Sequence, residues 1–200
     1  MNTYNLQKLR KKLQKHLDAE RFLHTQGVQY TCAAFAMRYG YDLGKAQVAG
    51  LLHDCAKCLS DEKKIRICHE NAIEISLAER QNPFLLHAKV GAFLAKKKYH
   101  IADEEILNAI RYHTTGRADM TLLEKITYIA DFIEPHRKPL PNHFLIRQVS
   151  FQDLDEAMYL ILKDVLSYLQ VTSDKTDPTT QDAYDYYAAL YQKKEMEKSL

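Results

Sequence analysis

Apolar residues recur at helical intervals along most of the chain. Between residues 20 and 39 they follow the spacing of one helix, and Gly40 directly after them is a typical stop signal. Periodicity and start signals predict further helices from 42 or 44 to 52, and at 61–68, 84–97, 103–113, 122–133, 153–169 and 179–195. No alternating strand pattern of useful length occurs in the sequence. We therefore predict an all-α fold, a bundle of helices.

The N-terminal segment, the proline-containing segment and the C-terminal segment complete the predicted domain organisation. Leucines at positions 6, 9, 13 and 17 among basic residues predict a surface helix docked on the domain. Prolines at 135, 139 and 141 predict an ordered loop, because the segment is short and keeps apolar residues at 144–146. We expect one structural domain made of an N-terminal helix at 1–19, a main domain at 20–170, and a C-terminal turn and helix at 171–200.

Composition and charge exclude several classes of protein. The chain has 200 residues and a net charge of +2 with both signs interspersed, so it lacks the single-sign field of a duplex nucleic-acid binder. No apolar run approaches the roughly 18 residues of a membrane span, and the N-terminus has no signal-peptide core. We expect a cytoplasmic protein that binds neither nucleic acid nor membranes. Cys55 and Cys58 form a Cys-x-x-Cys pair without matching further ligands, so reduced thiols are expected.

The candidate chemistry starts from His53 and Asp54, which end an apolar helical run. Carrying both side chains into a core costs stability unless they are paired or bind a metal. Three more histidines near helix ends and a later aspartate extend the pair to an ordered series, namely His24, His53-Asp54, His87, His113 and Asp131. A single histidine on an apolar helix is more often a hydrogen-bonded core residue, but the whole series favours a metal site, because His and Asp are typical ligands of divalent ions.

This series resembles the HD-domain metallophosphohydrolase superfamily, whose metal site lies in the central pocket of a helical bundle. The resemblance implies that His24, His53, Asp54 and Asp131 hold one metal. It further implies that His87 and His113 belong either to a second metal or to direct phosphate contacts.

Three longer motifs narrow the resemblance to the YqeK family of HD proteins. They are the segments 113–117 (His-Thr-Thr-Gly-Arg), 128–137 (Tyr-Ile-Ala-Asp-Phe-Ile-Glu-Pro-His-Arg) and 177–180 (Asp-Pro-Thr-Thr). The family is implied to hydrolyse diadenosine tetraphosphate symmetrically to two ADP, with iron as its usual metal. It also implies contacts to the base from the turn formed by Ser173, Asp174, Lys175, Thr176, Asp177 and Pro178.

The expected chemistry assigns a role to each candidate residue. A metal on the four ligands would lower the pKa of a water nucleophile and neutralise phosphoryl oxygens, with Asp54 or Asp131 orienting the water. Lys57 lies one helical turn beyond Asp54, so its ammonium group can contact a phosphate as a fixed positive charge. Arg117 and Arg137 are further candidates for polyphosphate contacts. Substrate contacts are also expected from the site residues His24, Asp54, His87, His113 and Asp131.

Several alternatives stay open from the sequence alone. The enzyme could act on another nucleotide as an HD phosphatase or phosphodiesterase, or the chain could be a nucleotide- or metal-binding module without turnover. Manganese, cobalt and zinc suit the same ligands as iron. Tyr184, Tyr187 and Tyr191 of the final helix could serve as core, as a homodimer interface or as a stacking platform for a base, and Glu134 as a structural partner.

Overall fold

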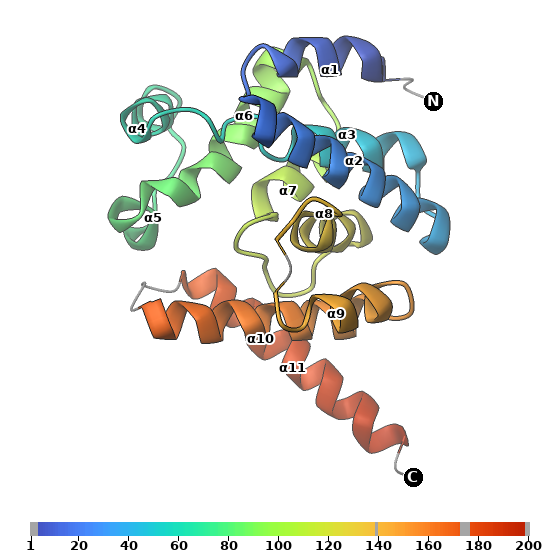
Figure 1. Cartoon of the computed structure of the whole chain (residues 1–200). Helices are drawn as coiled ribbons and strands as arrows, with labels where there is room; N and C mark the ends of the chain where they lie inside the picture. The colour runs from blue at the N-terminus through green and yellow to red at the C-terminus, as the bar shows by residue number, and fades with distance from the viewer. Residues whose placement is uncertain (1–3, 139, 173–176, 199–200) are drawn as a thin grey trace.

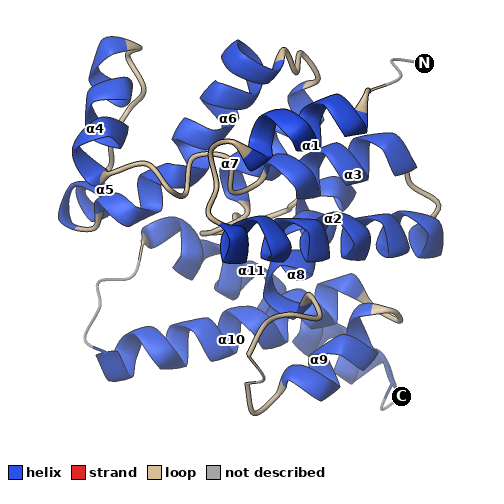
Figure 2. Cartoon of the chain, turned by 45° about the horizontal axis from the view of Figure 1, so that its top comes forward, coloured by secondary structure: helices blue, strands red, loops and turns tan. Residues whose placement is uncertain are grey.

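The computed structural model describes residues 4–138, 140–172 and 177–198, and within these ranges all regular structure is helical (Figure 2). The helices in chain order are α1 (Leu6–Gln14), α2 (Ala19–Tyr39), α3 (Leu43–Leu52), α4 (Asp61–Glu70), α5 (Leu77–Gln81), the 3-10 turn η1 (Pro83–Leu85), α6 (Leu86–Tyr99), α7 (Glu104–Tyr112), α8 (Leu122–Ile133), α9 (His143–Ser150), α10 (Leu154–Thr172) and α11 (Pro178–Lys198). The all-α prediction is confirmed.

Local capping chemistry sets most of the helix boundaries. The side chains of Asp42, Ser60 and Asp103 cap the first turns of α3, α4 and α7. Thr121 and Glu124 form a reciprocal capping box at the start of α8. Gly40 ends α2 in the left-handed conformation, with φ of 66°. These signals lie in the sequence, which explains why the predicted boundaries agree with the observed ones to within a few residues.

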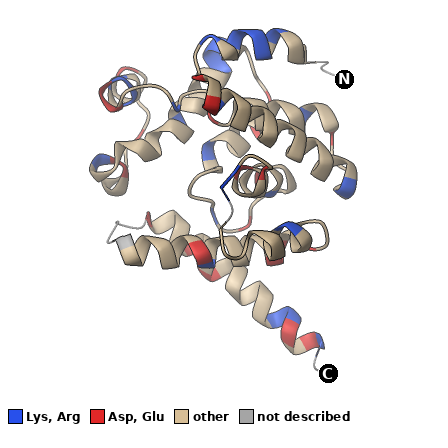
Figure 3. Cartoon of the chain, in the orientation of Figure 1, with Lys and Arg blue, Asp and Glu red and all other residues tan. Residues whose placement is uncertain are grey.

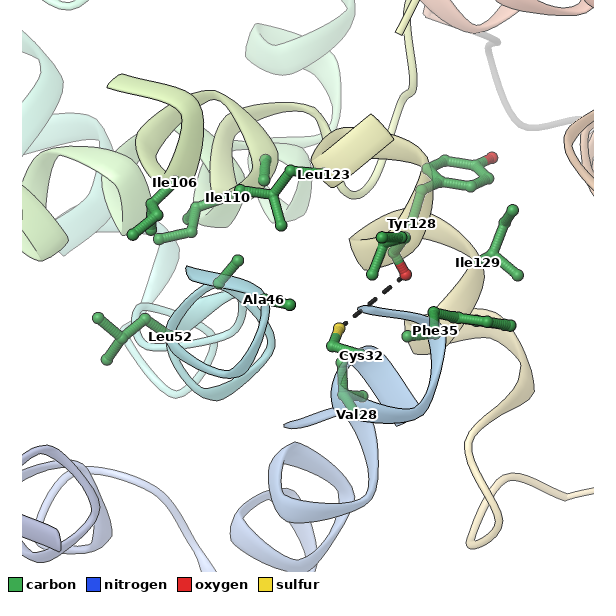
Figure 4. Close-up of a cluster of buried hydrophobic side chains, with 14 of the residues drawn as sticks. Val28, Cys32, Phe35, Ala46, Leu52, Ile106, Ile110, Leu123, Tyr128 and Ile129 are labelled. Atoms are coloured by element: carbon green, nitrogen blue, oxygen red, sulfur yellow. Dashed lines mark hydrogen bonds between the residues drawn. The ribbon is translucent and has the colours of Figure 1, made fainter. Parts of the chain in front are cut away.

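The helices pack around α8, with α1, α2 and α3 on one side and α9, α10 and α11 on the other (Figure 1). Buried side chains of α2, α3, α7 and α8 interlock between them, among them Phe35, Leu52, Ile110 and Leu123 (Figure 4). The Cys32 thiol also lies in this layer, where it donates to the carbonyl of Ile126 at 3.9 Å. This layer fixes the ends of α2, α3 and α8 relative to one another.

Close contact between α2 and α3 depends on Gly50. A Cβ atom at this position would lie 2.9 Å from Cys32 Sγ and 3.1 Å from the carbonyl oxygen of Val28. Because α3 can approach α2 this closely, the residues that end α3 come to lie beside the first turns of α2. Gly50 therefore helps to place His53 next to His24.

Gly50→Ala is expected to lower the free energy of unfolding by about 1–3 kcal/mol, because overpacking against backbone outweighs the better helix propensity of alanine. For a chain of this size each kcal/mol corresponds to a fall of about 2–4 °C in Tm, which calorimetry measures. Gly44→Ala in the same helix is the matched control, since its Cβ meets only the Asp42 side chain, at 3.2 Å. Equal Tm values for the two variants would contradict the packing argument.

Two short helices were missed by the sequence pattern. Residues 143–150, expected within a loop, form α9, whose Ile146 is fully buried. The prolines precede this helix, and eight residues are too few to show a clear period. Helix α5 has only five residues and depends on the Ser76–Glu79 capping box. Pro139 lies outside the described residues.

The tyrosines of α11 pack within the chain. Tyr159 of α10 stacks on Tyr184 and Tyr191, with ring centroids 6.0 and 4.5 Å apart. Tyr187 is buried, and its hydroxyl accepts a hydrogen bond from the Met120 backbone amide at 3.1 Å. Of the three alternatives for this stripe, the structure therefore shows the core packing that holds α11 on the domain.

The surface agrees with the charge pattern of the sequence. Lys and Arg gather on α1, while elsewhere both signs are interspersed (Figure 3). None of the helices in the described ranges combines the length and apolarity needed to cross a bilayer.

Candidate metal and phosphate site

Helices α2, α3 and α8 bring His24, His53 and Asp131 to one point. His24 lies in α2, His53 follows the last turn of α3, and Asp131 lies near the end of α8. The Nε2 atoms of the two histidines are 3.0 and 3.7 Å from Asp131 Oδ1. Both imidazoles are buried. Residues more than 100 positions apart thus converge on one small polar cluster within an apolar core.

Asp54 lies between two pairs of histidines. Its Oδ2 atom is 3.5 Å from His53 Nε2 and 3.9 Å from His24 Nε2. Its Oδ1 atom faces the other way, 3.3 Å from His113 Nε2 and 3.4 Å from His87 Nε2. The one carboxylate therefore connects the His24–His53 pair with the His87–His113 pair.

Every histidine of the series is held through its Nδ1 atom. The Nδ1–H groups of three of them donate to the backbone carbonyl three residues earlier: His53 to Gly50 at 2.7 Å, His87 to Phe84 at 2.6 Å and His113 to Ile110 at 2.7 Å. His24 instead donates to the Glu134 carboxylate at 3.0 Å. Since each Nδ1 carries a proton, Nε2 is the ring atom of each imidazole that is left to coordinate a metal.

The cluster fits a divalent metal ion. Among the described residues, His24 Nε2, His53 Nε2 and Asp54 Oδ1 are buried without a hydrogen-bond partner. Each such atom costs about 1–3 kcal/mol unless something pairs with it. Three or more ligand atoms lie within 4.8 Å of one another in two groups, one with His24, His53 and Asp131 and one with His53, Asp54 and His113. Neutral imidazoles and carboxylates are ligand types that first-row divalent ions accept.

The electrostatics keep these groups ready to bind a cation. Burial by itself would raise the pKa of Asp54, but His53, His113 and Lys57 hold it well below its usual range. Burial would also raise the pKa of Asp131, yet its close contact with His24 and the charge of Arg137 keep it well below its usual range. The two carboxylates therefore stay ionised. Metal binding then requires no proton to leave them.

Comparison with known proteins identifies the family. The HD domain family matches residues 21–135. The symmetrical bis(5'-nucleosyl)-tetraphosphatase of Bacillus subtilis (strain 168) is 37% identical to this chain, over 87% of the chain and 92% of that protein. The protein of the same name from Staphylococcus aureus (strain NCTC 8325 / PS 47) is 34% identical over 92% of the chain and 94% of its own length. The chain belongs to the symmetrical bis(5'-nucleosyl)-tetraphosphatase family.

A solved structure supports the same assignment. The crystal structure of a predicted HD superfamily hydrolase involved in NAD metabolism from Clostridium acetobutylicum has a TM-score of 0.89 and 37% identity, and it covers 94% of this chain and 99% of that one. The resemblance to HD-domain phosphohydrolases is thus confirmed for fold and family.

Three cationic side chains of this tetraphosphatase family member border its cluster of histidines and carboxylates. Arg21 Nη1 donates to Asp54 Oδ2 at 2.9 Å, and Arg137 Nη2 donates to Asp131 Oδ1 at 2.7 Å. On the opposite side, Lys57 Nζ lies 3.0 Å from His87 Nε2 and 4.0 Å from the centre of the Phe84 ring. Burial lowers the pKa of Lys57, and Asp54 opposes that shift. Positive charge therefore stands at both ends of the row of histidines.

Two candidate groups lie in other surroundings. Arg117 forms a two-point ion pair with buried Glu124, at 2.7 and 3.3 Å, next to the capping box of α8. Asp177 accepts a hydrogen bond from the Thr179 amide at 2.9 Å and so begins α11, of which Pro178 is the first residue. Their contacts to substrate stay predictions. Ser173, Asp174, Lys175 and Thr176 lie outside the described residues.

Sequence reasoning missed two residues of the site. Arg21 lies three positions before His24, hence on the same face of α2, and this spacing is the signal that would have found it. Thr114 was noted only as part of a motif, yet its hydroxyl lies 3.0 Å from His87 Nε2 and 3.1 Å from His113 Nε2. Glu134, expected to be a structural partner, is the group that orients His24.

The cysteine nearest the site is protected from reaction. Burial raises the pKa of Cys55 to about 12, and its thiol donates to the Gly91 carbonyl at 3.4 Å. All four cysteines are free, and of these Cys58 alone is exposed.

Brief alkylation of the native protein at mildly alkaline pH is expected to label Cys58 alone, because only its thiolate can meet the reagent. Intact-mass spectrometry would show one adduct, while protein unfolded in guanidinium would show four. A second adduct on the native protein would mean that Cys55 or another buried thiol opens to solvent.

Proposed function

We propose that this protein hydrolyses diadenosine tetraphosphate symmetrically to two ADP, using a divalent metal on His24, His53, Asp54 and Asp131. One observation carries the proposal: a row of histidines and carboxylates lies between Arg21 and Arg137 at one end and Lys57 at the other. A four-phosphate chain needs cations along its length, and attack at its middle requires such cations on both sides. The family membership supports the same substrate.

The reaction breaks the central P–O–P bridge. The oxygen of water forms a bond to one of the two central phosphorus atoms, the bridging oxygen leaves with the other phosphate, and both products are ADP. When bound, the metal lowers the pKa of the attacking water and polarises a phosphoryl oxygen. Asp54 has an oxygen without a hydrogen-bond partner among the described residues, so it can orient the water. Lys57 and Arg137 would stabilise the charge that develops on the two halves.

We assign His87 and His113 to orienting Lys57 and Thr114 as donors to the phosphate chain rather than to a second metal. Lys57 and Thr114 both lie within hydrogen-bond distance of His87 Nε2, so two donors already face this position. Burial and the adjacent ammonium of Lys57 hold the pKa of His87 well below its usual value. Metal analysis of the purified protein decides the question: one ion per chain supports this assignment, and two ions would turn the pair into ligands.

The nature of the metal and the assembly are further parts of the proposal. Iron is our first expectation, and manganese, cobalt or zinc would suit the same donors. A cytoplasmic location suits a nucleotide substrate. We also predict a homodimer, for which light scattering in solution is the test.

The decisive experiment is product analysis. Freshly purified protein of measured metal content is incubated with diadenosine tetraphosphate, and the nucleotides are separated by chromatography. We expect ADP as sole product. AMP together with ATP would contradict attack at the centre of the chain. If a metal-replete sample leaves diadenosine tetraphosphate intact but hydrolyses a mononucleotide, the result would favour an HD phosphatase with another substrate.

A further inference from the structure

A cavity lies beside the metal site, and several of its lining residues take no part in the chemistry described above. Its volume is about 610 Å³, and its wall includes Arg21, His24 and Arg137 from the catalytic cluster. Small-molecule sites commonly enclose ~300–1,000 Å³. The cavity is therefore large enough for a nucleoside and is continuous with the point where the phosphates must lie.

The lining of the cavity combines charged and apolar side chains. Leu23, Phe132 and Leu140 also contribute to its wall. Leu23 and Leu140 keep 47% and 49% of their surface exposed, so both apolar side chains are accessible to a ligand in the cavity. An apolar wall next to two guanidinium groups suits a ligand with a flat, weakly polar part and an anionic part.

His143 contributes a buried hydrogen-bond acceptor to the cavity. It lines the same cavity and is only 3% exposed. Its Nε2–H donates to the Phe132 carbonyl at 2.7 Å, so Nδ1 carries a lone pair, and this atom has no partner among the described residues. A buried acceptor needs a donor. Phosphate oxygens are acceptors, whereas ribose hydroxyls and the exocyclic amine of adenine are donors.

We infer that this cavity is the binding site for one nucleoside half of the substrate, with its phosphates held by Arg21 and Arg137. The inference rests on the proposed function for the identity of the whole substrate. The second half then extends past His87 toward Lys57. Arg21, which also contacts Asp54, is the residue that joins the nucleoside site to the metal site.

The test separates the nucleoside from the phosphates by measuring binding without turnover. Calorimetric titration of the metal-containing protein gives Kd values for ADP and for inorganic pyrophosphate. In the double variant Leu23→Ser/Leu140→Ser we expect ADP to bind about tenfold more weakly and pyrophosphate to bind as before, because only apolar contact is lost. In Arg21→Gln we expect both ligands to weaken about tenfold, because a charged phosphate contact is lost.

The matched control is Leu77→Ser/Leu145→Ser, which changes two other exposed leucines outside the cavity. It should leave both Kd values unchanged. The inference is overturned if the Leu23/Leu140 variant affects both ligands equally or neither, or if the wild type binds ADP no more tightly than pyrophosphate. If the wild type fails to cleave diadenosine tetraphosphate but shows the expected binding pattern, the proposed function fails and the nucleoside site stands.

Discussion

Asp54→Asn is expected to abolish metal binding and turnover together, with kcat falling by about 10³-fold or more, equivalent to roughly 4 kcal/mol of transition-state stabilisation. The reason is that the two oxygens of Asp54 face both pairs of histidines, at 3.3 to 3.9 Å. An amide of the same shape keeps one weak oxygen ligand and directs an NH₂ group at Nε2 atoms or at the metal.

The fold should survive this change. Burial disfavours the Asp54 carboxylate, but His53, His113 and Lys57 more than offset this and hold its pKa well below its usual range, so neutralising it costs some stability. We therefore expect a moderately lower Tm in excess chelator than that of the wild type, with a cooperative unfolding transition retained. Asp155→Asn is the isosteric control, since Asp155 pairs with Lys125 near the surface at 2.8 Å. A variant at position 54 that retains both metal and turnover would refute the central role of this carboxylate.

Glu134→Gln is expected to weaken metal affinity by about 10–100-fold, although Glu134 is not expected to touch the metal. Its Oε1 accepts the His24 Nδ1–H at 3.0 Å, and its Oε2 accepts the His136 amide at 2.7 Å. Glutamine can satisfy only one of these donors with its single oxygen. The His24 ring would then lose its fixed orientation and part of its basicity. Competition with a metal-sensitive chelator measures the affinity directly.

Gly27→Ala should also weaken metal affinity, because it displaces the Glu134 side chain instead of changing its chemistry. Gly27 lies in α2 one turn after His24, and a Cβ there would collide with Glu134 Oε2. Glu134 must therefore move, and His24 loses its partner. Glu124→Gln is the matched control, because Glu124 is equally buried but pairs with Arg117. We expect that variant to lose stability and keep its metal affinity, so similar metal affinities in all three variants would contradict the argument.

The sequence predicted the helices well because the forces that set them are local. Apolar spacing, the caps at Asp42, Ser60 and Asp103, and the stop at Gly40 each act within about one turn of the chain. Helix α9 was missed because eight residues after a proline-rich stretch carry little periodic signal, and its stability comes from burying Ile146 against other helices.

The candidate site likewise has features that the sequence shows and contacts that only the tertiary structure decides. The ordered series of histidines and aspartates is a property of the sequence, and it was sufficient to indicate a metal site and a family. Only the packing of α2, α3 and α8 decided that Asp54 joins two histidine pairs, that Arg21 reaches Asp54, and that Glu134 fits over Gly27 to hold His24. Among them, the Arg21–Asp54 and His24–Glu134 contacts join residues 33 and 110 positions apart. Neighbouring residues cannot specify them, because each depends on the distance and angle at which whole helices pack.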